Sequence, residues 1–159
     1  MNAQPHLRRE QSGVMLIEAL VAILIFSLGI LTVISLQTTS IRLTDDARMR
    51  TTATLLANRL IGQMWVNGNT VADIKTNFEN GGDAYNTWLA AVTDLNGGLP
   101  GVVGASGEVV STLPVVTVDS TAGATSGQVV ITLFWRTPSM PLDQPGHRHI
   151  VTTQISRNP

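Results

Sequence analysis

The feature that most constrains this chain is a run of 23 residues without a charged side chain, residues 19–41, which is dense in Leu, Ile and Val. The hydrocarbon core of a bilayer is spanned by about 20 apolar residues, at roughly 1.5 Å of helix per residue. The hydroxyl residues within the run are compatible with such a helix, because a helical hydroxyl can bond to its own backbone. We therefore predict a membrane-spanning helix over residues 14–36.

Positive charge precedes the apolar segment at Arg8 and Arg9. Basic residues tend to remain on the cytoplasmic side of a span. We therefore expect a single-pass membrane protein with a cytoplasmic N-terminus and an exported C-terminal part.

Three interpretations of this segment compete. A cleaved secretory signal has an apolar region of about 7–15 residues that ends in a small-x-small site, whereas this run is longer and no clear Ala-x-Ala site follows it. An ordinary signal anchor leaves Glu18 unexplained, since a carboxylate at mid-membrane costs about 2.5–3.5 kcal/mol. A cut just before Val14 would explain the presence of Glu18, because this carboxylate then lies one helical turn from a new α-amino group.

Residues 13–20 read GVMLIEAL and resemble the class III signal of type IV prepilins. The resemblance implies that residues 1–13 are a leader that prepilin peptidase removes after Gly13, on the cytoplasmic side. Val14 is then the first mature residue and the site of N-methylation. Members of the family more often begin with Phe, so the extent of methylation at Val14 stays open.

The resemblance also assigns roles to three charged residues. Arg8 and Arg9 supply the leader charge, and Glu18 matches the family's fifth-position glutamate. In the family, this glutamate pairs with the N-terminal amine of a neighbouring subunit and sets the register of assembly. Breaking such a pair in an apolar environment costs about 3–5 kcal/mol, because a buried charge is left without its partner.

Helical periodicity continues beyond the apolar segment. An apolar stripe with steps of three and four residues predicts an amphipathic helix over residues 37–65, packed against a small domain. Its members are Met49, Ala53, Leu56, Ala57, Leu60, Ile61 and Met64. A continuous helix from Val14 to about Trp65 is on the order of 80 Å long.

Residues 66–159 are expected to form a periplasmic α+β head. We predict a loop over residues 65–82 and a short helix over residues 83–95, with Asp83 as its N-cap and Tyr85, Trp88, Leu89 and Val92 on one face. Strands are predicted over residues 109–118, interrupted by Pro114, over residues 128–136 and over residues 149–155, with a loop over residues 137–146. Three or four antiparallel strands on a long helix agree with the type IV pilin fold that the resemblance implies.

Residues 55–65, together with residues 15–37, resemble the minor pilins of the PilV type. The chain has Ser35 where major pilins usually carry a helix-kinking proline, and it lacks the cysteines of their C-terminal disulfide loop. The resemblance implies a role in initiating pilus assembly, with a position in the tip complex left open. The implied partners are prepilin peptidase, the other minor pilins, the major pilin, the inner-membrane assembly platform and membrane lipid.

Two alternatives stand beside this interpretation: a minor pseudopilin of a type II secretion system, and a signal-anchored periplasmic enzyme or sensor. The net charge of −1 argues against nucleic-acid binding, and a chain without cysteine has no thiol chemistry. Glycines 97, 98, 101 and 104 lack the strand-to-helix context of a phosphate loop, and the serines lack a nucleophile motif. We expect no catalytic residue, no metal, no cofactor and no enzymatic activity.

His147 and His149 are two residues apart, with Asp143 nearby. On a strand, the two imidazoles would share one face and form a possible metal pair. Two ligands do not complete a site, so we predict a solvated edge instead. Trp65, Trp88 and Trp135 are predicted to lie in the core.

Overall fold

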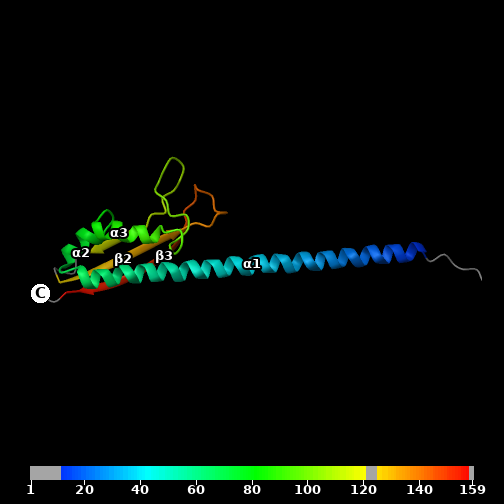
Figure 1. Cartoon of the computed structure of the whole chain (residues 1–159), viewed down its shortest axis with the longest axis horizontal. Coiled ribbons are helices and arrows are strands. Elements are labelled where there is room, and N and C mark those ends of the chain that lie inside the picture. The colour runs from blue at the N-terminus through cyan, green and yellow to red at the C-terminus, as the bar shows by residue number, and fades with distance from the viewer. Residues whose placement is uncertain (1–11, 121–124, 158–159) are drawn as a thin grey trace, which may run out of the picture. The chain divides into compact units, whose positions relative to one another are not determined.

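The structure, a computed structural model, describes residues 12–120 and 125–157. In the described residues the element order is α1 (Ser12–Asn67), α2 (Val71–Phe78), α3 (Asp83–Val92), β1 (Val115–Asp119), β2 (Ser126–Trp135) and β3 (His147–Ser156) (Figure 1). The chain divides into two compact units, one up to Asp45 and one from Asp46 onwards, and α1 contributes residues to both. The predicted long helix is confirmed, with its bounds extended to Ser12 and Asn67.

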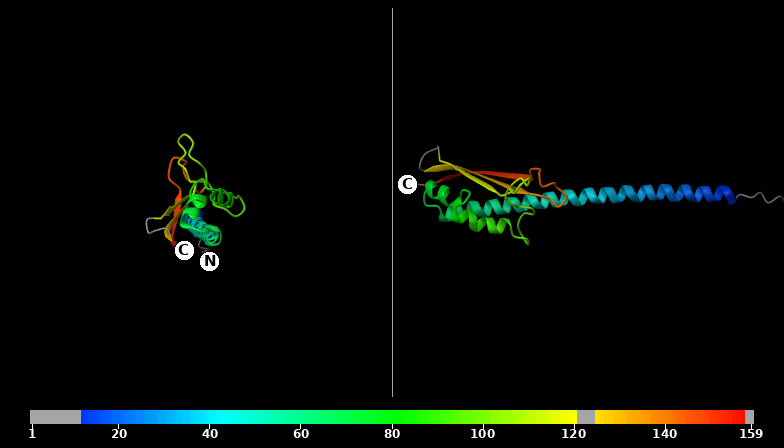
Figure 2. Two further views of the ribbon diagram at one scale, coloured as in Figure 1. Left: turned by 90° about the vertical axis from the view of Figure 1, so that its left-hand side faces the viewer. Right: turned by 90° about the horizontal axis from the view of Figure 1, so that it is seen from above.

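The unit from Asp46 onwards is an α+β head. The sheet has the order β1-β2-β3, and both pairs of strands are antiparallel. The strands lie on one side of this unit, and α2, α3 and the head part of α1 lie on the other (Figure 2). The sequence prediction of a small antiparallel sheet packed on a helix is therefore confirmed.

The core of the head lies between these two layers. The predicted stripe of α1 supplies Ala53, Leu56, Ala57, Leu60 and Met64, all buried, while Met49 and Ile61 pack at its margin. From the sheet come Val116, Val118, Val129, Ile131, Leu133, Trp135 and Ile155. The inward side chains of each strand alternate with outward ones, as the period of two in a β-strand requires.

The loop predicted over residues 65–82 is wrong, because the segment contains α2. Its start carries a capping box, in which Thr70 accepts a hydrogen bond from the amide of Asp73 and Asp73 accepts one from the amide of Thr70, both at 3.1 Å. Val71, Ile74 and Phe78 then become buried on one face of the helix. Burial of this face outweighs the turn-forming tendency of the asparagines and glycines on either side.

Helix α3 begins where the sequence indicated, but its N-cap is Gly82, and Asp83 is the first helical residue. The predicted face is confirmed, since Tyr85, Trp88 and Val92 are buried and Leu89 packs against the core. The prediction of a buried Trp65 is wrong. This side chain is 44 % exposed at the end of α1 and lies under the guanidinium of Arg157, which is 5.3 Å from the ring centroid.

Pro114 directly precedes β1, so only the second half of the strand predicted over residues 109–118 forms. This agrees with the absence of an amide hydrogen in proline. The best strand of the sequence becomes the central strand β2, and residues 137–146 form the predicted loop.

Candidate functional site

Three of the five residues assigned to the leader and assembly site are described by the structure. Gly13 and Val14 lie at the start of α1, and Glu18 lies one helical turn after Val14. Val14 is 71 % exposed, and Glu18 is exposed as well. Arg8 and Arg9 lie outside the described residues. The peptidase site, the methylation site and the role of Glu18 stay predictions.

Gly13 has open space around it. A Cβ atom built at this position meets no heavy atom within 4 Å, and the same is true of Gly29 and Gly62 on the same helix. Gly13 is therefore not required by packing within the described chain. Glycine weakens a helix by about 1 kcal/mol relative to alanine, so it favours opening of the first turn. A peptide bond inside a helix must unwind before it can enter a protease cleft in extended form.

The apolar part of α1 has no packing partner in the described chain. Its large apolar side chains, from Val14 to Leu36, are between 45 % and 75 % exposed. Each of them gains about 1.5–3 kcal/mol when it moves from water into an apolar environment. Helix α1 is long and apolar enough to cross a membrane.

The polar side chains of this part are satisfied locally. Ser27, Thr32 and Ser35 each donate a hydrogen bond to the carbonyl four residues earlier, at 2.7, 2.9 and 3.0 Å. The sequence prediction of hydroxyl back-bonding is confirmed. A helix whose hydroxyl groups are satisfied in this way presents little polar surface to lipid.

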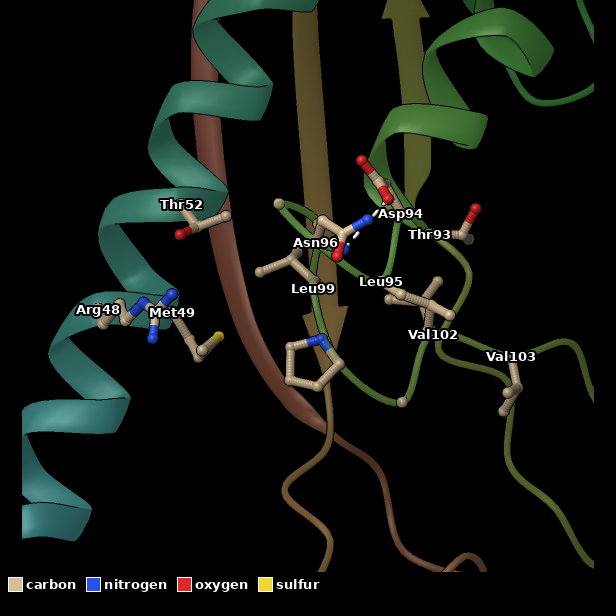
Figure 3. Close-up of a pocket in the computed structure, with 14 residues that line it drawn as sticks. Arg48, Met49, Thr52, Thr93, Asp94, Leu95, Asn96, Leu99, Val102 and Val103 are labelled. Carbon is tan, nitrogen blue, oxygen red and sulfur yellow. Dashed lines mark hydrogen bonds between the residues drawn. The ribbon is translucent and has the colours of Figure 1, made fainter.

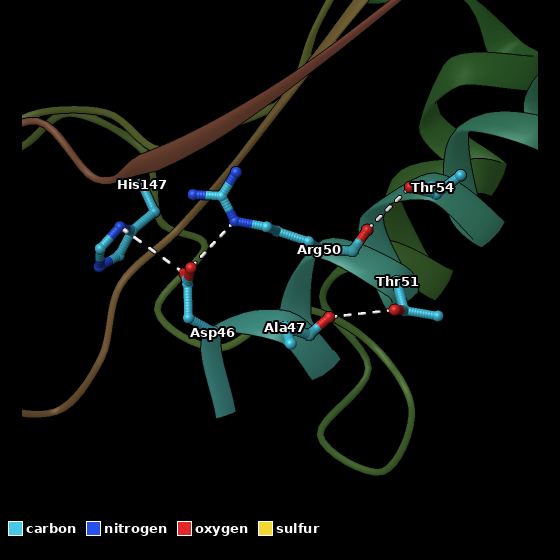
Figure 4. Close-up of polar contacts among 6 residues, drawn as sticks. All are labelled: Asp46, Ala47, Arg50, Thr51, Thr54 and His147. Atoms are coloured by element: carbon cyan, nitrogen blue, oxygen red, sulfur yellow. Dashed lines mark hydrogen bonds and ion pairs between the residues drawn. The ribbon is translucent and has the colours of Figure 1, made fainter. Parts of the chain in front are cut away.

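His147 and His149 do share one face of β3, as predicted, and β3 is an edge strand that follows the loop over residues 137–146. The two imidazoles are only half exposed, however, so the prediction that they are solvated is wrong. That face looks toward α1, where the Nδ1 atom of His147 lies 4.0 Å from the Oδ1 atom of Asp46 (Figure 4). His147 also stacks on Trp135, with ring centroids 5.7 Å apart. The Nε2 atom of His149 lies 3.1 Å from the hydroxyl of Thr54. Both imidazoles are half-buried contacts between the sheet and α1.

The polar groups around His147 belong to an intrachain contact. Asp46 also accepts a hydrogen bond from Arg50 at 2.9 Å, one turn along α1 (Figure 4). Within residues 12–120 and 125–157, no group of three or more His, Asp or Glu side chains could hold a metal ion. The arrangement therefore serves to join β3 to α1.

A hollow of about 550 Å³ lies between the head part of α1 and the loop that follows α3 (Figure 3). Arg48, Met49 and Thr52 line it from α1, and residues 93–103 line it from the loop. Asp94 accepts a hydrogen bond from the amide of Asn96 at 3.1 Å, so this carboxylate holds the turn after α3. The lining is mainly apolar side chains and backbone.

Sequence reasoning missed several polar residues that organise the head. Arg136 is 3 % exposed and donates to the carbonyls of Val110 and Gln144, both at 2.7 Å. Glu79 and Asn80 accept hydrogen bonds from backbone amides of β1. The partners of all three are main-chain atoms at least eight positions away in the sequence, so no local pattern of side chains indicates them.

Comparison of the chain with protein-family models, with curated proteins and with solved structures gave no match. The class that the structure defines is therefore an α+β protein with a long apolar N-terminal helix that could span a membrane.

Proposed function

We propose that this chain is a minor pilin of a type IV pilus, of the PilV type, with the type IV pilin fold. Prepilin peptidase removes residues 1–13 on the cytoplasmic side of the inner membrane. The mature chain, anchored by the apolar part of α1 with its head in the periplasm, then joins the other minor pilins and the major pilin at the assembly platform. It takes part in initiating the filament.

The observation that carries this proposal is the spacing at the start of α1. An unobstructed glycine comes directly before Val14, and Glu18 lies one turn further on the same exposed apolar helix. A cut after Gly13 creates an amine at the N-terminus of the helix. A carboxylate near that end is stabilised by the helix dipole, by about 0.3–1 kcal/mol when exposed.

The fold supports the proposal independently. An exposed apolar helix that continues into an amphipathic helix, with an antiparallel sheet packed on its second part, supplies both a membrane anchor and a folded head. In an assembled filament, the same apolar surface would be covered by the helices of neighbouring subunits.

The proposal is tested by determining the N-terminal residue of the mature protein in the organism that makes it. Mass spectrometry is expected to find a chain that begins at Val14, with or without one methyl group. Gly13→Leu is expected to leave the precursor unprocessed. Gly29→Leu is the matched control, since it makes the same change at another unobstructed glycine of α1, and it should be processed normally.

An intact N-terminus in the wild-type protein, or normal processing of Gly13→Leu, would contradict the proposal and favour a signal-anchored enzyme or sensor. A second outcome would identify a minor pseudopilin of a type II secretion system. In that case the mature chain begins at Val14, and deletion of the protein abolishes protein secretion while pili still form.

A further inference from the structure

The two edges of the sheet differ in how their backbone groups are satisfied. At the β1 edge, the amide of Val116 donates to Oδ1 of Asn80 at 2.7 Å, and the amide of Val118 donates to Oε1 of Glu79 at 2.8 Å. Asn80 also donates to the carbonyl of Pro114 at 3.3 Å. Two side chains at the end of α2 therefore occupy hydrogen-bonding positions that an added strand would use.

The direction of each β3 backbone group follows from this arrangement. Successive residues of an antiparallel strand point their backbone groups alternately to the two sides. Because Val116 and Val118 point away from β2, Val115 and Thr117 pair with β2, through Thr132 and Val130. The backbone groups of Ile131, which lies between these two, and of Val129 and Leu133, two positions on either side of it, therefore point to β3.

In β3, Leu133, Ile131 and Val129 pair with His149, Val151 and Thr153, respectively. The backbone groups of Arg148, Ile150, Thr152 and Gln154 therefore point away from the sheet. Within the described residues, no hydrogen bond reaches these four amides and no strand lies beyond β3. All four residues are exposed, and Ile150 is 49 % exposed.

An open edge of this kind is unusual. Native sheets protect their edges with proline, lysine, bulges or covering segments, because unpaired backbone groups pair readily with another strand. Strand β3 has ten residues and contains neither proline nor lysine, while the shorter β1 is blocked. We propose that the β3 edge is a docking site for an extended segment of a different polypeptide, which adds to the sheet as a fourth strand.

Two arguments exclude the head-to-tail and the two-fold antiparallel pairing of copies of this chain at the β3 edge. Head-to-tail pairing of β3 with the β1 edge of another copy is blocked by Glu79 and Asn80. Two-fold antiparallel pairing of two β3 strands would set the head parts of the two α1 helices antiparallel, since the contacts of Thr54 with His149 and of Met64 with Arg157 show that the head part of α1 runs parallel to β3. The second argument rests on the proposed function, in which both chains enter one bilayer through the residues that precede Asp46.

The edge also defines the chemistry of its partner. The backbone ladder requires an extended segment without proline at the positions that face β3. The outward side chains of β3 include one cation, Arg148, and no acid. The segment should therefore carry an acidic residue near Arg148 and β-branched or aliphatic residues beside Ile150 and Thr152.

The first experiment measures whether the edge accepts a strand, with the purified full chain in detergent as its own probe. Glu79→Ala combined with Asn80→Ala frees the amides of Val116 and Val118, so it should shift the particles from one chain to two or more as concentration rises. Glu79→Gln, which keeps an acceptor, should behave like the wild type. Adding Thr152→Pro to the double variant should reverse the association, because it blocks the centre of the β3 edge without removing a bond to β2.

Should Thr152→Pro fail to fold, Ile150→Lys combined with Thr152→Lys places charge on the same edge and keeps the strand. A folded double variant that stays at one chain per particle overturns the proposal, and so does a wild-type chain that dimerises through β3. This experiment is independent of processing. An intact N-terminus in the producing organism would remove the pilin assignment and leave the result at the edge in place.

The second experiment identifies the occupant. A photoreactive benzoylphenylalanine replaces Thr152 in the full chain in the producing organism, and Thr117 is the matched control, because it is also an exposed threonine on an edge strand of the same sheet. Position 152 should cross-link to one segment of a different protein, and position 117 should not. That segment, made as a peptide, should slow hydrogen exchange at the amides of Ile150 and Thr152. Cross-links to this chain alone, equal cross-linking at both positions, or no protection by the peptide would overturn the proposal.

Discussion

Tyr85, the only tyrosine of the chain, links α3 to the segment before β1. The residue is 4 % exposed, and its hydroxyl donates a hydrogen bond of 2.7 Å to the carbonyl of Pro114. Burial raises the pKa of Tyr85 above the ordinary value of 10.0. The free energy of unfolding of the head therefore depends on alkaline pH through this residue.

The expected sign follows from linkage. The unfolded chain releases the phenolic proton near pH 10 and the native head retains it to higher pH, so the stability that Tyr85 contributes is complete below about pH 10 and is lost as pH rises through the native pKa. Tyr85→Phe should flatten this part of the pH profile and cost about 0.5–1.5 kcal/mol at neutral pH, the value of one hydrogen bond. Ultraviolet titration of tyrosinate reports the single residue, and a midpoint equal in native and denatured protein would contradict the prediction.

Helix α1 ends against a cation from the other end of the chain. The guanidinium of Arg157 donates to the carbonyls of Met64 and Trp65 and lies over the Trp65 ring. The last carbonyls of a helix have no partner within the helix and carry the negative end of its dipole. The same residue binds the end of β3 to the end of α1, although the two segments are more than ninety residues apart.

Arg157→Met should therefore lower the free energy of unfolding of the head by about 1–3 kcal/mol, since hydrogen bonds to a charged group and a cation–π contact are lost together. Arg148→Met is the matched control, because Arg148 lies on the exposed face of β3, the strand that Arg157 directly follows, and its effect should stay within about 0.5 kcal/mol. Denaturation followed by tryptophan fluorescence measures both variants. Equal losses would show that Arg157 does not hold the end of α1.

One carboxylate of the chain lies within its apolar, membrane-length segment. Glu18 is the single acidic residue of the apolar part of α1, on a helix whose large side chains are exposed from Val14 to Leu36. Burial of that surface in lipid or against other helices leaves the carboxylate without water. The proposed function supplies its partner through the amine of a neighbouring subunit.

Glu18→Gln keeps the shape of the side chain and removes the charge. The variant should still be processed at Val14, yet fail to support pilus formation, because an unpaired buried amine costs about 3–5 kcal/mol per subunit. Glu108→Gln, at an exposed position of the head, should assemble normally. N-terminal mass and counts of pili by electron microscopy measure the two effects, and normal piliation by Glu18→Gln would show that the charge is not needed.

Several features could be predicted from the amino-acid sequence alone. The stripe from Met49 to Met64, the central strand β2 and the membrane-length segment all depend on residues that are neighbours in the chain. Helix α2 could also have been found from its capping box, Thr70 followed by Asp73. The motif around Glu18 is contiguous too, since residues 13–20 follow one another in the chain.

The contacts of the two histidines with α1, the role of Arg157 and the contrast between the β1 and β3 edges were decided by tertiary structure alone. His149 meets Thr54 across 95 positions of the chain, and Val118 meets Glu79 across 39. Periodicity reports which face of an element is apolar, because that property belongs to contiguous residues. It does not report which backbone amides find a partner, because this depends on how strands and helices are ordered in space once the core has formed.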